Sequence, residues 1–155
     1  DVYKRQEEVG LDLEQRGIKL NYSNLVSPDT VVIADPEQMK KVINNIISNS
    51  VKYMDKPDGH IDIRILDEVD SIRVEIEDNG KGIAQKDLQK IFERFYRTDA
   101  SRNSAQGGSG IGLSIVKKIV EDHGGYVWAT AKEGEGTCMH FVLRKYIELQ
   151  PGGTK

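Results

Sequence analysis

The stretch that decides the fold runs from Gln106 to His123 and reads QGGSGIGLSIVKKIVEDH. Its first part is rich in glycine, and its second part carries apolar residues at helical spacing. Glycines directly before a helix let the backbone approach a ligand closely, and the unpaired N–H groups of the first helical turn favour an anion. The segment therefore predicts a phosphate-binding loop that leads into an amphipathic helix.

The glycine run alone leaves a second interpretation open, in which a flexible loop precedes an ordinary core helix. It lacks the Gly-Lys-Ser/Thr ending of a P-loop, and Leu113 stands where the dinucleotide-binding pattern needs its last glycine. The rest of the chain has to decide between these interpretations.

The composition is that of one folded domain. The chain has 155 residues, 37% hydrophobic and 30% charged, which is enough for a single sizeable core. A net charge of −3 without a basic run argues against nucleic acid as a partner. The single cysteine, Cys138, excludes an intramolecular disulfide and fits a reducing compartment. The sequence has no apolar run long enough to cross a membrane.

Hydrophobic periodicity predicts an α+β fold. The expected strands cover residues 18–22, 31–34, 61–65, 72–76, 126–131 and 137–143. Expected helices cover residues 7–15 and 36–53, a short piece that ends at Phe95, and the segment after the glycine run. We therefore expect a two-layer α/β sandwich, with a mixed, mostly antiparallel sheet of about five strands and about three helices on one face.

Five short blocks stand out along the chain. They are NIISNSVKY at Asn45–Tyr53, DNGKGI at Asp78–Ile83, IFERFYR at Ile91–Arg97, GGSGIGLSIV at Gly107–Val116 and GEGT at Gly134–Thr137. Their order and spacing resemble the N, G1, F and G2 boxes, and the late Gly-x-Gly-Thr, of the catalytic ATP-binding domain of bacterial sensor histidine kinases. The resemblance covers Ile18 to Leu143 and implies the Bergerat ATP-binding fold.

The first block places three polar residues on one helical face, because Asn45, Asn49 and Lys52 fall at i, i+4 and i+7. A solvated helix surface is the alternative, but the continuous apolar stripe beside them predicts a face that borders a polar cleft. The resemblance implies that Asn49 supplies an oxygen ligand to Mg²⁺, which takes few protein ligands. It also implies that Asn45 and Lys52 lie against the phosphates of ATP.

The second block carries the base-recognition residue. The resemblance implies that Asp78 accepts a hydrogen bond from the adenine amino group, while Gly80 and Gly82 let the backbone pass close to the base. The alternative for Asp78 is a simple turn residue after a strand. Further residues of this region, by the resemblance, are the apolar walls Tyr53 and Ile83, and Thr137, which reaches the base through water.

The remaining blocks are assigned to the lid and the phosphates. Phe92 and Phe95 are first of all core residues and, by the resemblance, also anchor a lid over residues 96–106. Arg97 and Arg102 are lid cations able to approach the terminal phosphate, and the sequence leaves open which one does so. The triphosphate is expected at N–H groups of Gly108, Gly110, Ile111, Gly112 and Leu113.

Three residues depart from the family pattern. Ser50 replaces the usual alanine, Lys41 stands where glutamine is common, and Ser109 replaces threonine. None of them is expected to touch a proposed ligand contact.

The chemistry follows from the residue at position 45. Relatives of this fold that hydrolyse ATP or phosphorylate serine use a glutamate there as general base, whereas Asn45 cannot accept a proton. Neutral imidazole needs no such base at neutral pH, so phosphotransfer to histidine by Asn45, Lys52 and Arg97 is favoured. An ATPase or anti-sigma serine kinase of the same fold, and an inactive ATP-binding regulatory module, remain as alternatives.

The acceptor histidine is expected outside this chain. His60, His123 and His140 all lack the His-Glu/Asp setting of an acceptor helix, so a dimerisation and acceptor domain is expected upstream. Residues 1–6 match the translation of a common sequencing adapter and, with a linker helix, fill residues 1–17. Residues 18–146 should form the ATP-binding domain, and residues 147–155 a loose tail.

The resemblance also implies a cellular setting. The domain should be cytoplasmic and, as this fragment, monomeric. Its parent should be a homodimer anchored in the inner cell membrane that signals to a response regulator.

Overall fold

The computed structural model describes residues 17–94, 96 and 112–147. The expected helix at residues 7–15 lies outside the described residues, and so does nearly all of the expected lid. Six candidate site residues also fall outside them: Phe95, Arg97, Arg102, Gly108, Gly110 and Ile111.

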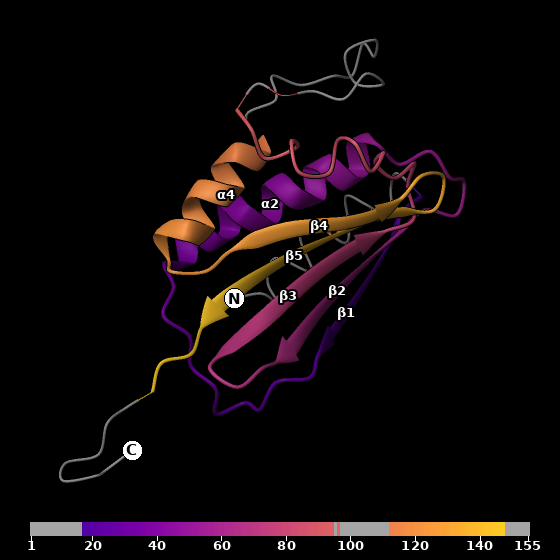
Figure 1. Cartoon of the computed structure of the whole chain (residues 1–155). Helices are drawn as coiled ribbons and strands as arrows, with labels where there is room; N and C mark the ends of the chain where they lie inside the picture. The colour runs from indigo at the N-terminus through magenta and orange to yellow at the C-terminus, as the bar shows by residue number, and fades with distance from the viewer. Residues whose placement is uncertain (1–16, 95, 97–111, 148–155) are drawn as a thin grey trace, which may run out of the picture.

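The described residues form one five-stranded sheet covered on one face by two helices (Figure 1). The strands are β1 (Lys19–Asn24), β2 (His60–Asp67), β3 (Ser71–Asp78), β4 (Val127–Lys132) and β5 (Gly136–Arg144); the helices are α2 (Pro36–Lys52) and α4 (Gly112–Asp122). The sheet order is β1-β2-β3-β5-β4, with β1 parallel to β2 and every other pair antiparallel. This confirms the expected mixed, two-layer α+β architecture.

Helix α2 begins where the sequence predicts. The side chain of Asp35 accepts hydrogen bonds from the backbone N–H groups of Glu37 (2.9 Å) and Gln38 (3.4 Å), and Pro36 occupies the first helical position. The buried stripe of the helix faces the sheet. Its members are Val42, Ile46, Ile47 and Ser50.

The core lies between the helices and the inner face of the sheet. Strands β2 and β3 alternate, so that their isoleucines and valine point toward the helices, while their charged residues, except Asp78 at the end of β3, point away. Phe141 of β5 and Val116 of α4 are almost fully buried in the same core. Phe92 is buried there too, as its interpretation as a core residue predicts.

Two expected elements differ from the structure. Within the described residues, the strand expected at residues 31–34 is reduced to a single bridge between Val32 and Lys145, the residue directly after β5. In place of the short helix that was expected to end at Phe95, residues 85–94 form a series of turns. The N–H groups of Lys90 and Glu93 bond to carbonyls three residues back, and the bond from the Ile91 N–H to the Asp87 carbonyl (3.1 Å) is not continued into an α-helix. Two helices rather than about three are therefore found in the described part of the chain.

Neither described helix is long and apolar enough to span a membrane.

Candidate active site

The polar face of α2 lies beside the start of α4. Asn45, Asn49 and Lys52 are all half-buried along α2. A Cβ atom added to Gly112, the first residue of α4, would lie 3.7 Å from the Asn45 side-chain oxygen. Two motifs about 60 residues apart in the sequence thus meet at the first turn of α4.

Asp78, the last residue of β3, lies next to the same helix. Its Oδ1 atom accepts a hydrogen bond from the Gly80 N–H (2.9 Å), and the Ser50 side chain and the Thr137 backbone also act to lower its pKa. Burial raises the pKa of Asp78 above its ordinary value, more than these groups lower it, and the nearby Glu77 charge raises it further. The site therefore holds a carboxylate that has lost water and has gained neutral donors.

The turn after β3 is attached to the C-terminal end of α2. The Lys81 N–H donates to the Tyr53 carbonyl oxygen (3.1 Å). Ser50, directly after Asn49, is buried with 4% of its surface exposed, and it acts to lower the pKa of Asp78 against the effect of burial. That no departure from the family pattern touches a ligand contact stays a prediction.

The two glycines after Asp78 make room for protein backbone. A Cβ atom on Gly80 would lie 2.7 Å from the Tyr53 carbonyl oxygen, and one on Gly82 would lie 2.3 Å from that of Lys132. Gly82 also has a φ of +74°, which side chains rarely adopt. These glycines hold the loop against α2 and against the β4–β5 turn, which fixes the position of Asp78.

Basic side chains gather around Tyr53, where α2 ends. The Nζ atoms of Lys52 and Lys81 each lie 5.4 Å from the centroid of the Tyr53 ring, and Lys56 Nζ donates to the Gly80 carbonyl (3.2 Å). Sequence analysis selected Lys52 but not Lys56 or Lys81. Lys81 lies inside the DNGKGI block, so its position was a usable signal.

The remaining described candidates lie around this region. Thr137 is buried and stands opposite Asp78 in the β3–β5 register. Ile83 and Leu113 are partly buried and pack against the core. The structure thus places the turn after Asp78 at the end of α2 and the start of α4 beside Asn45 of the same helix, whereas the lid candidates lie outside the described residues.

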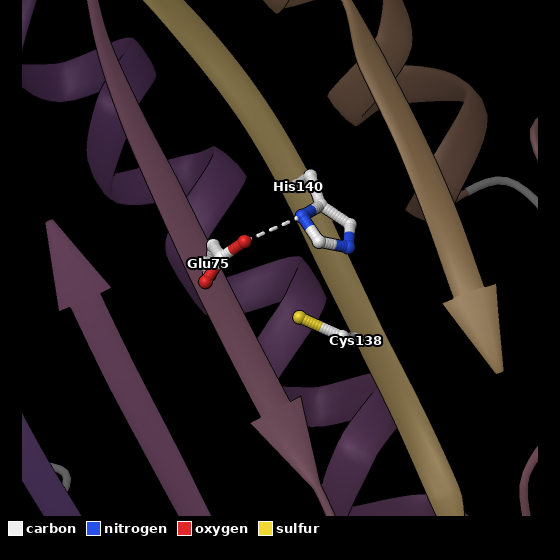
Figure 2. A group of neighbouring side chains, drawn as sticks. All are labelled: Glu75, Cys138 and His140. Carbon is white, nitrogen blue, oxygen red and sulfur yellow. Dashed lines mark ion pairs between the residues drawn. The ribbon is translucent and has the colours of Figure 1, made fainter. Parts of the chain in front are cut away.

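A second polar cluster lies on the opposite face of the sheet. Glu75, Cys138 and His140 converge from β3 and β5, on the side of the sheet away from α2 (Figure 2). One potential metal-ligand atom from each lies within 4.8 Å of the others. His140 Nδ1 lies 2.9 Å from Glu75 Oε2, a short contact that is poorly aligned as a hydrogen bond.

Two arginines make this second cluster an ion-pair network. Arg64 Nε lies 3.1 Å from Glu75 Oε1, its Nη2 lies 3.9 Å from Cys138 Sγ, and Arg73 Nε lies 3.6 Å from Glu75 Oε2. Burial raises the pKa of Cys138 to about 12, so the thiol keeps its proton. The two guanidinium groups already supply positive charge beside Glu75, and they would repel a metal ion.

The three histidines hold structural positions. His123 ends α4, where Nδ1 lies 2.7 Å from the Ile119 carbonyl and Nε2 accepts from the Asp35 N–H (3.1 Å). This ring therefore links the end of α4 to the N-cap residue of α2. His60 begins β2 and His140 is buried in β5.

Comparison with known proteins identifies the family. The family of histidine kinase-, DNA gyrase B- and HSP90-like ATPases matches residues 34–147. Sensor histidine kinase WalK of Bacillus subtilis is 41% identical over 122 residues, which cover 77% of this chain and 20% of WalK. WalK of Staphylococcus aureus is 40% identical over 111 residues, which cover 70% of this chain and 26% of that protein. The chain thus spans a fifth to a quarter of these relatives.

Solved structures agree with this assignment. The mycobacterial sensor histidine kinase MprB has a TM-score of 0.77 at 28% identity, with 92% of each chain covered. The catalytic domain of histidine kinase ThkA has a TM-score of 0.74 at 30% identity, with 92% of this chain and 88% of that chain covered. The chain belongs to the histidine kinase-, DNA gyrase B- and HSP90-like ATPases, among the ATP-binding catalytic domains of sensor histidine kinases.

Proposed function

We propose that this chain binds Mg-ATP between α2 and the end of β3 and transfers the γ-phosphate to a histidine of a separate acceptor domain. The observation that carries the proposal is that the turn after Asp78 packs on the end of α2, and the first residue of α4 lies beside Asn45 of the same helix. Each supplies a different part of nucleotide recognition: an acceptor for the base, amide groups for the phosphates, and a helix N-terminus for negative charge.

The metal assignment rests on the chemistry of the donors. Mg²⁺ prefers oxygen ligands and keeps several waters, so the half-buried amide of Asn49 fits as a protein ligand. The ion would supply charge neutralisation at the triphosphate. Asn45 and Lys52 would orient the phosphates from the same face of α2, and Arg97 or Arg102 would approach from the lid.

The reaction requires no base from this chain. Asn45 cannot take a proton, and a neutral imidazole of the acceptor attacks the γ-phosphorus with its own lone pair. The bond from that phosphorus to the bridging oxygen breaks, and ADP leaves. Positioning and charge neutralisation then account for the rate enhancement.

The wider setting is part of the same proposal. Residues 18–146 would form the catalytic domain, monomeric as a fragment, within a homodimeric parent anchored in the cell membrane. The histidine kinase ThkA has been solved in complex with the response regulator protein TrrA. A response regulator is accordingly the proposed downstream partner of the parent kinase.

The test is transfer of labelled phosphate. The chain is mixed with γ-labelled ATP, Mg²⁺ and the acceptor-helix domain of a WalK relative, and we expect label on that domain that is acid-labile and base-stable. Asn49→Ala should lose both Mg-dependent ATP affinity and transfer, whereas the control Ser48→Ala, exposed on the same helix, should retain them. Acid-stable phosphoserine, or unchanged Mg-ATP binding by Asn49→Ala, would contradict the proposal.

A further inference from the structure

The turn that follows Asp78 is tied to the start of β2 and to the loop before it, the α2–β2 loop (residues 53–59). The side-chain oxygen of Asn79 accepts a hydrogen bond from the His60 N–H (2.8 Å), and its side-chain nitrogen donates to the Asp58 carbonyl (3.2 Å). Both polar atoms of this amide thus attach the turn to the rest of the domain.

These two bonds fix which way the amide of Asn79 points. A backbone N–H can only donate and a carbonyl can only accept, so the oxygen must face His60 and the nitrogen must face Asp58. A residue present only for its turn-forming tendency would bond to its own backbone nearby, whereas the partners of Asn79 lie 19 and 21 residues earlier in the chain. A carboxylate would lack the donor, and a methyl group would lack both groups. This position therefore uses the amide itself.

We infer that Asn79 is a positioning residue for base recognition: its amide fixes the turn to the α2–β2 loop and so holds the Asp78 carboxylate toward the exocyclic amino group of adenine. The inference rests on the proposed function, since it takes Asp78 as the base-recognition residue. Asn79 lies in the DNGKGI block, where the resemblance assigns Asp78, Gly80 and Gly82 but gives Asn79 no role.

The carboxylate of Asp78 is oriented by this turn. Its Oδ1 atom accepts a hydrogen bond from the Gly80 N–H (2.9 Å), so a tilt of the turn would move the carboxylate with it. On its other side, the turn is attached to Tyr53, a proposed wall of the base pocket, through the Lys81 N–H (3.1 Å). Removal of the Asn79 amide would leave that attachment in place, so the turn should stay folded but be free to tilt.

The effect should be confined to recognition of the base. The proposed phosphate and metal contacts, Asn45 and Asn49, lie on α2 rather than on the turn. A nucleotide without the 6-amino group makes no use of an oriented Asp78 carboxylate, so its affinity should be nearly independent of Asn79. The two nucleotides therefore separate positioning of Asp78 from a general loosening of the site.

The experiment measures, by calorimetry, the binding of Mg-ATP and of the magnesium complex of purine riboside triphosphate, which lacks the 6-amino group. We expect Asn79→Ala to weaken ATP by about fivefold and the amine-free analogue by less than about twofold, so that the ratio of the two affinities falls. A general loss of folded structure would instead weaken both nucleotides alike. A thermal melt checks that the variant is folded.

A second variant loosens the same turn and keeps Asn79. Lys56 Nζ donates to the Gly80 carbonyl (3.2 Å), and Lys56→Met removes this bond while it keeps an unbranched stem. We expect the affinity ratio to fall by about twofold. Any loss of charge that acts on the triphosphate is shared by both ligands and cancels in the ratio. This variant tests the positioning of the turn even if Asn79→Ala fails to fold.

The matched control is Asn24→Ala. The Oδ1 atom of Asn24 accepts a hydrogen bond from the Val26 N–H (2.9 Å), so the control loses the same kind of bond. It does so at the opposite end of the sheet from Asp78, and neither nucleotide's affinity should change. The double variant Asn79→Ala/Asp78→Asn should bind ATP no more weakly than Asp78→Asn alone, because the asparagine acts through the carboxylate.

Three results would overturn the inference. Equal weakening of ATP and the analogue by Asn79→Ala would show a purely structural role, and additive losses in the double variant would show action independent of Asp78. If Asp78→Asn loses its preference for the amine while Asn79→Ala and Lys56→Met keep it, the inference fails and the proposed function stands. Failure of the wild type to bind ATP would instead refute the proposed function itself.

Discussion

Two carboxylates three residues apart on β3 have opposite environments. Glu75 points away from the helices into the ion-pair network of Arg64, Arg73 and His140, and Asp78 lies at the helix-covered end of the strand. An odd separation along a strand places side chains on opposite faces, so this contrast follows from the pleat. The same strand thus carries a structural carboxylate and a recognition carboxylate.

Their pKa values shift in opposite directions for identifiable reasons. Burial alone would raise the pKa of Glu75, but the hydrogen bond from Arg64 and the charges of His140, Arg64 and Arg73 outweigh it, and the pKa is lowered. Burial also raises the pKa of Asp78, and there the neutral donors are too weak to reverse it. A carboxylate that is paired with cations stabilises the fold. A carboxylate without such a cation can accept a hydrogen bond from a ligand.

The stability consequences have opposite signs. A lowered folded-state pKa means that Glu75 stabilises the protein above its ordinary pKa, and this contribution is lost as the pH falls through the folded value. A raised folded-state pKa means that ionised Asp78 costs stability at neutral pH, and protonation on acidification relieves that cost. Substitutions at the two positions should therefore separate binding from stability.

The largest expected effect is that of Asp78→Asn on nucleotide recognition. We expect ATP affinity to fall by roughly 10- to 100-fold, because a charged acceptor for the amino group is replaced by a neutral amide. The preference for ATP over inosine triphosphate should fall with it. Calorimetry measures both, and the free energy of unfolding should stay equal or rise. Unchanged base preference would remove the recognition role from Asp78.

Glu75→Gln should show the reverse pattern. We expect the free energy of unfolding to fall by about 1.5–3 kcal/mol, because Arg64 and Arg73 lose their shared carboxylate in a partly buried setting. ATP affinity should change less than about twofold. Urea denaturation measures the stability.

The matched control for this variant is Glu77→Gln on the same strand. Glu77 pairs with Arg64 (3.1 Å), but 48% of its side chain is exposed, so its loss should cost under about 1 kcal/mol. Equal losses from the two variants would show that burial and the second arginine add nothing at Glu75.

The region around Asp78 and α2, which carries the sequence motifs, was predictable from the sequence. Asp78 is recognisable because it closes a period-two strand and opens a glycine turn, and the asparagines of α2 share a face by simple helical spacing. The sheet with both helices on one face also follows from the alternation in β2 and β3. Such features depend on the spacing of residues within one segment, which can be read from a single sequence.

The network around Glu75 depends on strand register, which cannot be read from a single sequence. Glu75 meets His140 only because β3 and β5 pair antiparallel with these residues opposite each other, although β5 comes more than 50 residues later. The turn after Asp78 meets Tyr53 only through the packing of α2 on the sheet. The strand expected at residues 31–34 was wrong for a similar reason: its apolar pattern is present, but in the part of the chain that the structure describes it forms only the bridge from Val32 to Lys145.

The smallest expected effect concerns how the ion-pair network around Glu75 and His140 changes the free energy of unfolding with pH. Burial lowers the pKa of His140 below its ordinary value of 6.5, against the opposing pull of Glu75. As the pH falls below 6.5, the unfolded chain takes up a proton that the folded chain resists, so the free energy of unfolding decreases. Glu75 adds its own loss only below its ordinary pKa of 4.5.

His140→Gln should therefore flatten the stability profile between these two values and leave the loss below 4.5 in place. The difference between variant and wild type should stay within about 1 kcal/mol, the range of one net side-chain hydrogen bond. Urea melts at a series of pH values measure it, and ATP affinity at neutral pH serves as the control that should not move. A profile equally steep in the variant would mean that the arginines, not the buried imidazole, set the acid sensitivity of this face. The difference between the environments of Glu75 and Asp78 would then be due to Arg64 and Arg73 alone.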